Sequence, residues 1–311
     1  MAQIFIQGAA RMSYDGVALF AQDAVTLGTV FAPADTRIEF MQTTNNGYPD
    51  LVDGVGILVN KVPGVNIGQL RVSGVVHPDR GFHTFVNQRF GPRTGGLLLP
   101  DMMNLVPYSG GTAIGATGVY WQSIRLSSSF SVQGGQQVVS FVATALVLDP
   151  KNFYVAATLT TPTYVGTAGA GIAPFVRASF NNDGATTYDL IRSVDFALSN
   201  GMQIQPAIKS TSQRIAAGCT PGVIKGALTL TQLGGAANPV PQTDGTYPID
   251  MVLPTGDGTH TLTVATSMSY DSGNTVASPT DFLGKGVNYS LFGLSAGSTT
   301  TAAFPIVASY V

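Results

Sequence analysis

The chain has 311 residues, enough for two domains of ordinary size that each enclose a hydrophobic core. Only 10% of its residues are charged, against about 25% in a typical soluble domain, whereas 44% are apolar and the net charge is −2. This balance argues against a basic surface that binds nucleic acid specifically, and it favours a protein that buries much of its surface against other subunits.

The start of the chain, MAQIFI, has no basic segment before its apolar residues, so the sequence predicts no secretory signal. Among the longest apolar runs, Val138–Leu148 is interrupted by Ser140 and Thr144 and is far shorter than the roughly 20 residues of a transmembrane helix. We therefore expect a protein that is made in the cytosol and does not insert into a membrane.

Segments with a period of two predict β-strands along most of the chain. The 37 glycines and 18 prolines recur every few residues and favour turns over helices. In Ile124–Val132 and in Thr261–Tyr270, apolar residues alternate with mostly serine and threonine, as half-buried strands require. The best short helical candidates are Phe82–Phe90 and Thr187–Arg192. We expect an all-β chain, or a β chain with one short helix per domain.

Three blocks occur twice in the same order, which predicts an internal duplication. In the first block, Arg37–Phe40 and Ser193–Phe196 each place an acidic residue on the side of the strand opposite an aromatic one. An Asn-Gly pair follows each of them and can form a turn with positive φ.

The second and third blocks keep nearly the same separation, at offsets of about 150 to 156 residues. The second block pairs Gly68–Val76 with Gly222–Leu230, where a glycine interrupts the apolar face of a strand after a basic residue. Strands bend, or another chain packs closely, at such a glycine. The third block pairs Val138–Ala143 with Val287–Phe292, each preceded by two glycines.

The duplication divides the chain into two predicted domains, residues 1–160 and 187–311, joined by a linker region at 161–186 that is rich in glycine. Within the first domain, Gly91–Gly118 reads as an irregular loop that is long for a compact domain. It contains a cluster of leucine and methionine that is unfavourable in water. The loop is either an arm that packs on a neighbouring subunit or a segment that covers its own core.

The three histidines do not form a convincing metal site. His77 and His83, with Asp79 between them, could approach each other, but no third ligand presents itself. His260 follows an Asp-Gly turn at the start of a strand. We interpret all three histidines as turn or surface residues.

The other candidates for chemistry also favour structural roles. Cys219, the only cysteine, has no base nearby in the sequence and is interpreted as a small packed residue; it excludes an intrachain disulfide. The glycines at 166, 169 and 171 do not form a phosphate-binding loop. The Asp-Gly pairs lack the spacing of a calcium loop and read as turns: Asp15, Asp53, Asp183, Asp244 and Asp257. The sequence thus predicts no catalytic, cofactor-binding or metal-binding residue, and no enzyme.

Taken together, the repeated blocks resemble the tail tube proteins (major tail proteins) of long-tailed bacteriophages. The resemblance lies in the pattern and order of the blocks and covers most of residues 25–150 and 175–296. It implies a mainly β fold with two tandem tail-tube-like β-sandwich or barrel domains, each with at most a short helix.

The resemblance also implies a function. The chain is then a structural virion protein that polymerises as stacked rings into the hollow tail tube, through which DNA passes from capsid to host. Two fused domains imply a ring of three chains with pseudo-sixfold symmetry. The implied partners are further copies of the chain and the tape-measure, tail-tip and head–tail connector proteins. The implied location is the virion tail, after synthesis in the host bacterial cytoplasm.

On this interpretation the strands expected to line the lumen are Arg37–Phe40, Ile124–Val132, Ser193–Leu198 and Thr261–Tyr270, and Gly91–Gly118 is the candidate for ring-to-ring contact. A near-neutral wall suits a channel through which DNA slides without sticking. One alternative is another self-assembling β-rich virion or surface-layer protein, such as a capsid or decoration subunit. A weaker alternative is an outer-membrane β-barrel, which needs a signal peptide and aromatic girdles, whereas the only tryptophan is Trp121.

Overall fold

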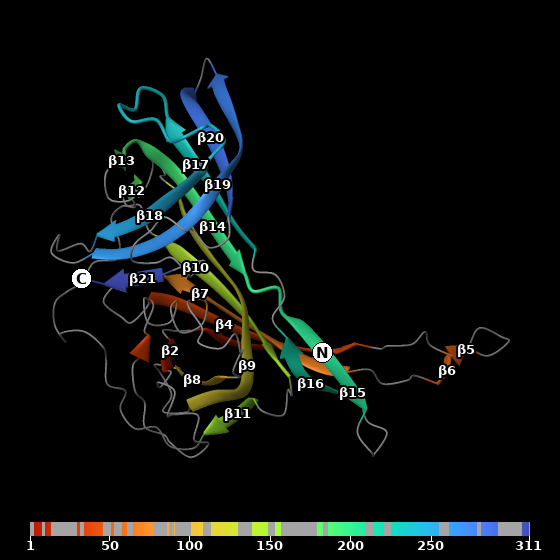
Figure 1. The fold of residues 1–311 in the computed structure, drawn as a ribbon. Coiled ribbons are helices and arrows are strands. Elements are labelled where there is room, and N and C mark those ends of the chain that lie inside the picture. The colour runs from red at the N-terminus through yellow and green to blue at the C-terminus, as the bar shows by residue number, and fades with distance from the viewer. Residues whose placement is uncertain are drawn as a thin grey trace.

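A computed structural model of the chain consists almost entirely of β-structure in the part that it describes (Figure 1). The described residues are 3–7, 10–13, 30–31, 34–45, 51–52, 58–60, 65–76, 86, 90, 101–107, 113–129, 139–148, 153–156, 179–182, 186–208, 214–220, 225–254, 261–278, 281–291 and 307–310. The mainly β fold class expected from the period-two segments is confirmed.

Seventeen of the described strands form one sheet, and the other four form two hairpins that project from it. Apart from β1 (Gln3–Gln7), the described strands form two sets of ten. The first unit comprises β2 (Ala10–Ser13), β3 (Val30–Phe31), β4 (Ala34–Asn45), β5 (Leu51–Val52), β6 (Leu58–Asn60), β7 (Val65–Val75), β8 (Asp101–Pro107), β9 (Ala113–Ser129), β10 (Ser140–Val147) and β11 (Phe153–Ala156). The second unit comprises β12 (Ser179–Asn182), β13 (Thr186–Tyr188), β14 (Ile191–Ser199), β15 (Gln203–Ile208), β16 (Arg214–Thr220), β17 (Lys225–Leu233), β18 (Thr246–Pro254), β19 (Thr261–Ser278), β20 (Asp281–Leu291) and β21 (Val307–Tyr310).

The two units pair their strands in the same antiparallel pattern. In the first unit the pairs are β2–β3, β2–β8, β4–β7, β5–β6, β7–β10, β8–β9, β9–β10 and β9–β11. In the second unit they are β12–β13, β12–β18, β14–β17, β15–β16, β17–β20, β18–β19, β19–β20 and β19–β21. Each strand from β2 to β11 therefore has a counterpart ten strands later. In Figure 1 the hairpins β5–β6 and β15–β16 extend from the same side of the sheet.

The two units also share a β-bulge at the same place. Strand β9 contains one extra residue, Gln122, directly after Trp121 where it pairs with β10. Strand β19 contains one extra residue, Asp271, directly after Tyr270 where it pairs with β20. A β-bulge bends its strand and increases the local twist, so a bulge at the same place gives both units the same curvature.

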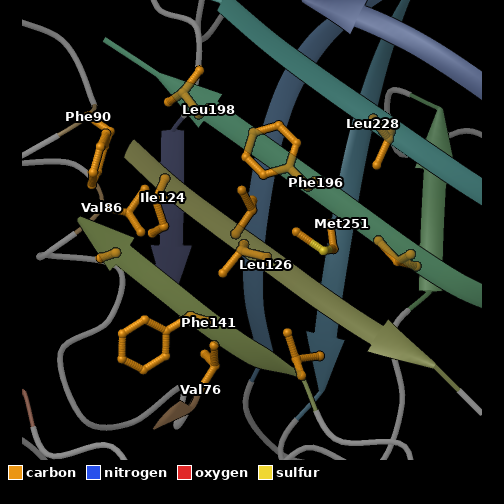
Figure 2. Packing of buried hydrophobic residues seen from close by; sticks show 14 of the residues in the cluster. Val76, Val86, Phe90, Ile124, Leu126, Phe141, Phe196, Leu198, Leu228 and Met251 are labelled. Carbon is orange, nitrogen blue, oxygen red and sulfur yellow. The ribbon is translucent and has the colours of Figure 1, made fainter. Parts of the chain in front are cut away.

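Alternation of side chains along the strands places one face of the sheet in the core. In β10 every second residue from Phe141 to Val147 is buried, and β14 and β17 follow the same period. Figure 2 shows Leu126 of β9, Phe196 of β14 and Leu228 of β17 on this face, where the register places Phe196 opposite both of the others. These three side chains belong to one buried cluster that contains residues of both units.

Among the described strands, a single pairing joins the two units, that of β9 with β14, from Ser193 opposite Ser129 to Ser199 opposite Ser123. Because the sheet and the core continue across this junction, the structure does not confirm two separate domains. The predicted boundaries at residues 160 and 187 stay predictions, and β12, inside the predicted linker region, pairs with β18.

The Asn-Gly turn predicted after the first block of the second unit is confirmed. Gly201 has φ of 58°, which glycine adopts without the steric penalty of a side chain. The buried Asn200 side chain donates a hydrogen bond to the carbonyl of Trp121 at 3.2 Å, and its backbone N–H donates to the carbonyl of Gln122 at 2.8 Å. The turn therefore also fastens the end of β14 to β9.

Of the two helical candidates, one falls partly within the described residues and the other is wrong. Val86 and Phe90, inside the first candidate, are helical and buried. The second candidate, Thr187–Arg192, contains the end of β13, Leu190 with φ of 54°, and the start of β14. A leucine with positive φ breaks helical geometry, and the Leu190 carbonyl instead accepts a hydrogen bond from the Leu233 N–H at 2.9 Å.

The interpretation of Gly91–Gly118 as one long loop is also wrong. Residues 101–107 form β8, and β9 begins at Ala113, so most of the second half of this segment lies in the sheet. Polar Asn104 separates Met103 from Leu105, but the apolar neighbours Met102 and Val106 obscure the period of two in the sequence. Residues 91–100 lie outside the described part of the chain.

The repeated blocks fall on counterpart strands, but two of the three block alignments are out of register. The first block is correctly aligned, since Phe40 and Phe196 lie opposite Leu70 and Leu228. Leu228 is therefore the counterpart of Leu70. The second block instead aligns Leu70 with Ile224, which lies four residues earlier. Ala145 and Tyr289 are also counterparts, because they lie opposite Leu70 and Leu228. The alignment of the third block differs from this one by five residues, and an odd difference exchanges the two faces of the strand. Short alternating segments look alike in several registers, and the neighbouring strands decide between them.

We predict that Phe196→Ala lowers the free energy of unfolding by about 3–5 kcal/mol, because it leaves a cavity where β9, β14 and β17 meet. Urea denaturation followed by circular dichroism measures the change. The neighbouring variant Ala197→Ser lies on the opposite face and serves as the control, with an expected change within about 0.5 kcal/mol. Equal stability of the two variants would contradict the assigned core.

Candidate functional site: the polar face of the sheet

The face of the sheet opposite the core carries mostly small polar side chains on strands of both units. We call it the polar face, and it comprises the outward residues of β4, β7, β9, β10, β14, β17, β20 and the second half of β19. On β9 these residues are Ser123, Arg125 and Ser127, and on β14 they include Asp195. Val142 and Leu146 of β10 also point to this side and are half-buried.

Among the described residues, Arg71 with Glu39 and Arg125 with Asp195 form ion pairs on the polar face. Arg71 of β7 lies 3.7 Å from Glu39 of β4, within the first unit. Arg125 of β9 donates to Asp195 of β14 across the junction, with an Nε–Oδ1 distance of 2.7 Å and a second contact from Nη2 to Oδ2. The hydrogen bond that Arg125 donates to Asp195 raises the pKa of Arg125. Each pair balances its own charges, whereas Lys225, at the start of β17 on the same face, is exposed.

Cross-strand hydrogen bonds between small side chains order the rest of the polar face. Ser123 and Thr144 hydroxyl groups are 2.6 Å apart, and those of Ser127 and Ser140 are 3.0 Å apart. In the second unit the Asn288 amide donates to the Ser272 hydroxyl at 3.1 Å. Each of these partners lies directly opposite the other in the ladder.

One of these contacts repeats between the units. Ser123 and Ser272 each follow the extra bulge residue of their strand, and each bonds the residue directly opposite it. The bulge therefore aims a hydroxyl at the neighbouring strand in both units. The extra residue Asp271 itself accepts a hydrogen bond from the Ser290 hydroxyl at 2.8 Å.

A buried amide holds the segment that follows β17. The Gln232 side chain is 1% exposed and donates to the carbonyl oxygens of Asp189 and Asn238 at 3.0 and 2.8 Å. Its oxygen accepts from the Val240 N–H at 2.9 Å. Three hydrogen bonds compensate the cost of burying the amide, so this glutamine is explained by structure rather than by chemistry on a ligand.

Cys219, one of the residues that the sequence analysis considered for chemistry, lies in β16 opposite Ile204. Burial raises the pKa of its thiol to about 11, and this thiol in turn contributes to the raised pKa of Tyr120, which is due mainly to burial. A thiol with a raised pKa is a poor nucleophile at neutral pH.

The remaining candidates lie mostly outside the described part of the chain. His77, His83, Asp79 and His260 belong there, as do the glycines at 166, 169 and 171 and four of the five Asp-Gly aspartates. Asp244 is described, and it is exposed in the bend before β18. Within the described ranges, no three His, Cys, Asp or Glu side chains are grouped as they would be around a metal ion. Those ranges also hold no helix with the length and apolar character needed to cross a membrane.

The four strands expected to line a lumen belong to one sheet. Ile124–Ser129 and Ser193–Leu198 lie in the neighbouring strands β9 and β14, which the sequence did not pair. Arg37–Phe40 lies in β4 and Thr261–Tyr270 in β19, toward opposite ends of the sheet. The Arg125–Asp195 pair was also missed. Its only signal in the sequence is a charged residue among small side chains on one face of each strand.

No family model and no curated protein matches the chain, so sequence similarity assigns it to no family. The case for a function therefore depends on the repeat, the junction and the polar face.

We predict a small coupling energy between Arg125 and Asp195, because both side chains are partly exposed to water. A double-mutant cycle with Arg125→Gln and Asp195→Asn, measured by urea denaturation, should give about 0.2–1 kcal/mol at low salt. The coupling should shrink when the ionic strength is raised. Independence of salt, or additive effects of the two variants, would contradict the ion pair.

We predict that Cys219 reacts slowly with Ellman's reagent. At pH 8 the folded chain should react about a hundredfold more slowly than the urea-unfolded chain, because a pKa of about 11 in place of 9.0 lowers the thiolate fraction by that factor. The rate for the folded protein should rise as the pH approaches 11. Because Cys219 is the only cysteine, the absorbance change reports this site alone. Equal rates before and after unfolding would contradict the burial of the thiol.

Proposed function

We propose that this chain is a structural virion protein that assembles with copies of itself into stacked rings, which form the hollow tail tube of a long-tailed bacteriophage. In this role it conducts DNA from the capsid to the host and catalyses no reaction. Its further partners would be the tape-measure, tail-tip and head–tail connector proteins.

The β9–β14 junction is the observation that carries this proposal. Through it, two equivalent ten-strand units join edge to edge in one sheet. A head-to-tail contact that is repeated between identical chains generates a ring when the rotation closes and a filament when it does not. Closure into a ring also removes the exposed sheet edges that otherwise invite aggregation. The chain thus already contains one step of the arrangement that a ring would repeat.

The polar face supports the choice of a DNA-conducting tube. A wall that binds DNA needs unpaired cations, since phosphate contacts by lysine and arginine dominate affinity. On the polar face, Arg71 and Arg125 are each held by a carboxylate, and Lys225 is exposed at the start of β17. Small hydroxyl and amide groups bond one another across the strands. Such a surface offers passing DNA few contacts of its own. The resemblance to tail tube proteins in the order of the repeated blocks agrees with this role.

The repeat supports a particular stoichiometry. If single-unit relatives form rings of six, a chain with two units forms a ring of three chains. The two units differ in their side chains, so the ring would have pseudo-sixfold rather than true sixfold symmetry.

We predict that the purified protein at high concentration forms hollow rings or short tubes under negative-stain electron microscopy. Rings should show three chains by mass photometry and six similar lobes in class averages. The control is the same sample diluted below the assembly threshold, which should contain dispersed chains. Dispersed monomer at every concentration would contradict self-assembly. Closed shells or flat sheets would instead support a capsid, decoration or surface-layer subunit.

A further inference from the structure

Strand β1 is the one described strand without a counterpart in the repeat. It pairs with the edge of β4 that faces away from β7, from Gln3 opposite Met41 to Gln7 opposite Arg37. In the second unit the same edge of β14, facing away from β17, pairs with β9 of the first unit. Strand β1 therefore lies against the first unit in the place where β9 lies against the second unit.

At the other end of the repeat, part of β19 has an open edge among the described strands. Met268 and Ser269 pair with both β18 and β20, so these two strands lie on opposite edges of β19. Beyond Tyr270, β20 continues along one edge to Ser278, whereas the edge that carried β18 has no described strand beside it. The equivalent edge of β9 is the one that pairs with β14.

We propose that the open edge of β19 in one copy of this chain pairs with β4 of the next copy, in place of β1, in the register of the β9–β14 junction. The inference rests on the proposed ring assembly and specifies its contact. Counterpart residues follow from the first repeated block and from the shared bulge after Trp121 and Tyr270. The register is then Arg37 opposite Ser278, Glu39 opposite Val276, Met41 opposite Asn274 and Thr43 opposite Ser272.

The backbone supports this pairing. An unpaired strand edge is a row of free N–H and C=O groups, ready to add another strand. Residues 271–275 of β19 are exposed, and Ser272, Gly273 and Asn274 are small enough to admit a neighbouring strand. Because β19 and β4 are different surfaces, the contact is head-to-tail and can be repeated from copy to copy.

The charges on the polar face are also consistent with this register. Asp195 faces Thr229 on its own unit and takes its arginine, Arg125, from the preceding unit. Glu39 already has Arg71 within its own unit. At the position of Arg125, β19 carries Asn274, a neutral residue. Each of the two carboxylates therefore keeps one arginine when the contact is repeated between chains, and the polar face continues without added charge.

Strand β1 then protects the edge of β4 until assembly. A covered edge prevents the free chain from pairing with unrelated strands, and the exchange of β1 for β19 conserves the backbone hydrogen bonds of β4. The exchange also explains why, among the described strands, the first unit alone carries an additional one.

Cross-linking tests the register. In a Cys219→Ala background, Met41→Cys combined with Asn274→Cys places two thiols opposite each other on the polar face, about 4.5–5.5 Å apart between Cβ atoms. Cross-linking within one chain is excluded because β7, β10, β9, β14, β17 and β20 lie between β4 and β19. With a short bismaleimide, denaturing gels should show a ladder of covalent dimers and trimers.

The matched control replaces Asn274→Cys by Thr275→Cys, whose side chain points to the other side of the strand. The control should give about a tenfold lower yield of cross-linked chains, since its two thiols lie on opposite faces. Equal yields from the two pairs would overturn the register. If the first pair fails to fold by circular dichroism, Thr43→Cys with Ser272→Cys tests the same register two residues away.

The exchange of β1 has its own test. Replacing both Ile4 and Phe5 by proline removes two consecutive N–H groups, one of which must belong to the ladder with β4. This variant should cross-link faster through the 41–274 pair than the chain with intact β1. The control, Ile4→Ala with Phe5→Ala, keeps the ladder and should change the rate less. An unchanged or slower rate in the proline variant would overturn the displacement of β1.

The two proposals fail separately. Hollow rings without register-specific cross-links would support the proposed tail tube but overturn the proposed contact between β19 and β4. Register-specific cross-links in material that forms no rings would support the contact and overturn the tube.

Discussion

The pairing of β9 with β14 is the constraint on which the rest of the structure depends. Each unit taken alone would expose the polar backbone groups of a long strand at its edge, and such an edge must be paired or protected. The chain satisfies this requirement once internally, by setting the second unit against the first. The same requirement recurs at both ends of the sheet, where β1 covers β4 and part of β19 stays open among the described strands.

The repeat preserves backbone geometry more strictly than side-chain identity. Both units bend at an extra residue after an aromatic side chain, yet the residues opposite differ: Ala145 faces Trp121, whereas Tyr289 faces Tyr270. The two tyrosines pack edge to face, with ring centroids 6.1 Å apart. Burial and the neighbouring tyrosines raise the pKa of Tyr289, and its hydroxyl donates to the carbonyl of Pro241 at 2.5 Å. Two tyrosines are together larger than a tryptophan and an alanine, and the second unit accommodates them with Tyr270 only partly buried.

On the opposite face of the sheet, the position of the charged residues is also repeated between the units. Both units place a carboxylate at the same position of their first strand, and each carboxylate has one arginine. In one unit the arginine comes from the neighbouring strand of that unit, and in the other it comes across the junction. Exposed ion pairs add little to stability. Their effect here is to balance the charges of Arg71 and Arg125, which suits the proposed passage of DNA.

The sequence by itself determined the strands and the faces of many of them, because a period of two in side-chain polarity is a local property of an extended chain. The alternation in Ile124–Val132 by itself puts Ile124 and Leu126 on one face and Arg125 on the other, and both apolar residues are buried. The order of the repeated blocks also matches the order of the counterpart strands. The tertiary structure alone decided the register of the second and third blocks, the strands inside Gly91–Gly118, and the pairing of Arg125 with Asp195. These features depend on which strand lies alongside which. An alternating segment fits a neighbour equally well after a shift of two residues, and only the bulges, the core contacts and the junction between the units select one arrangement.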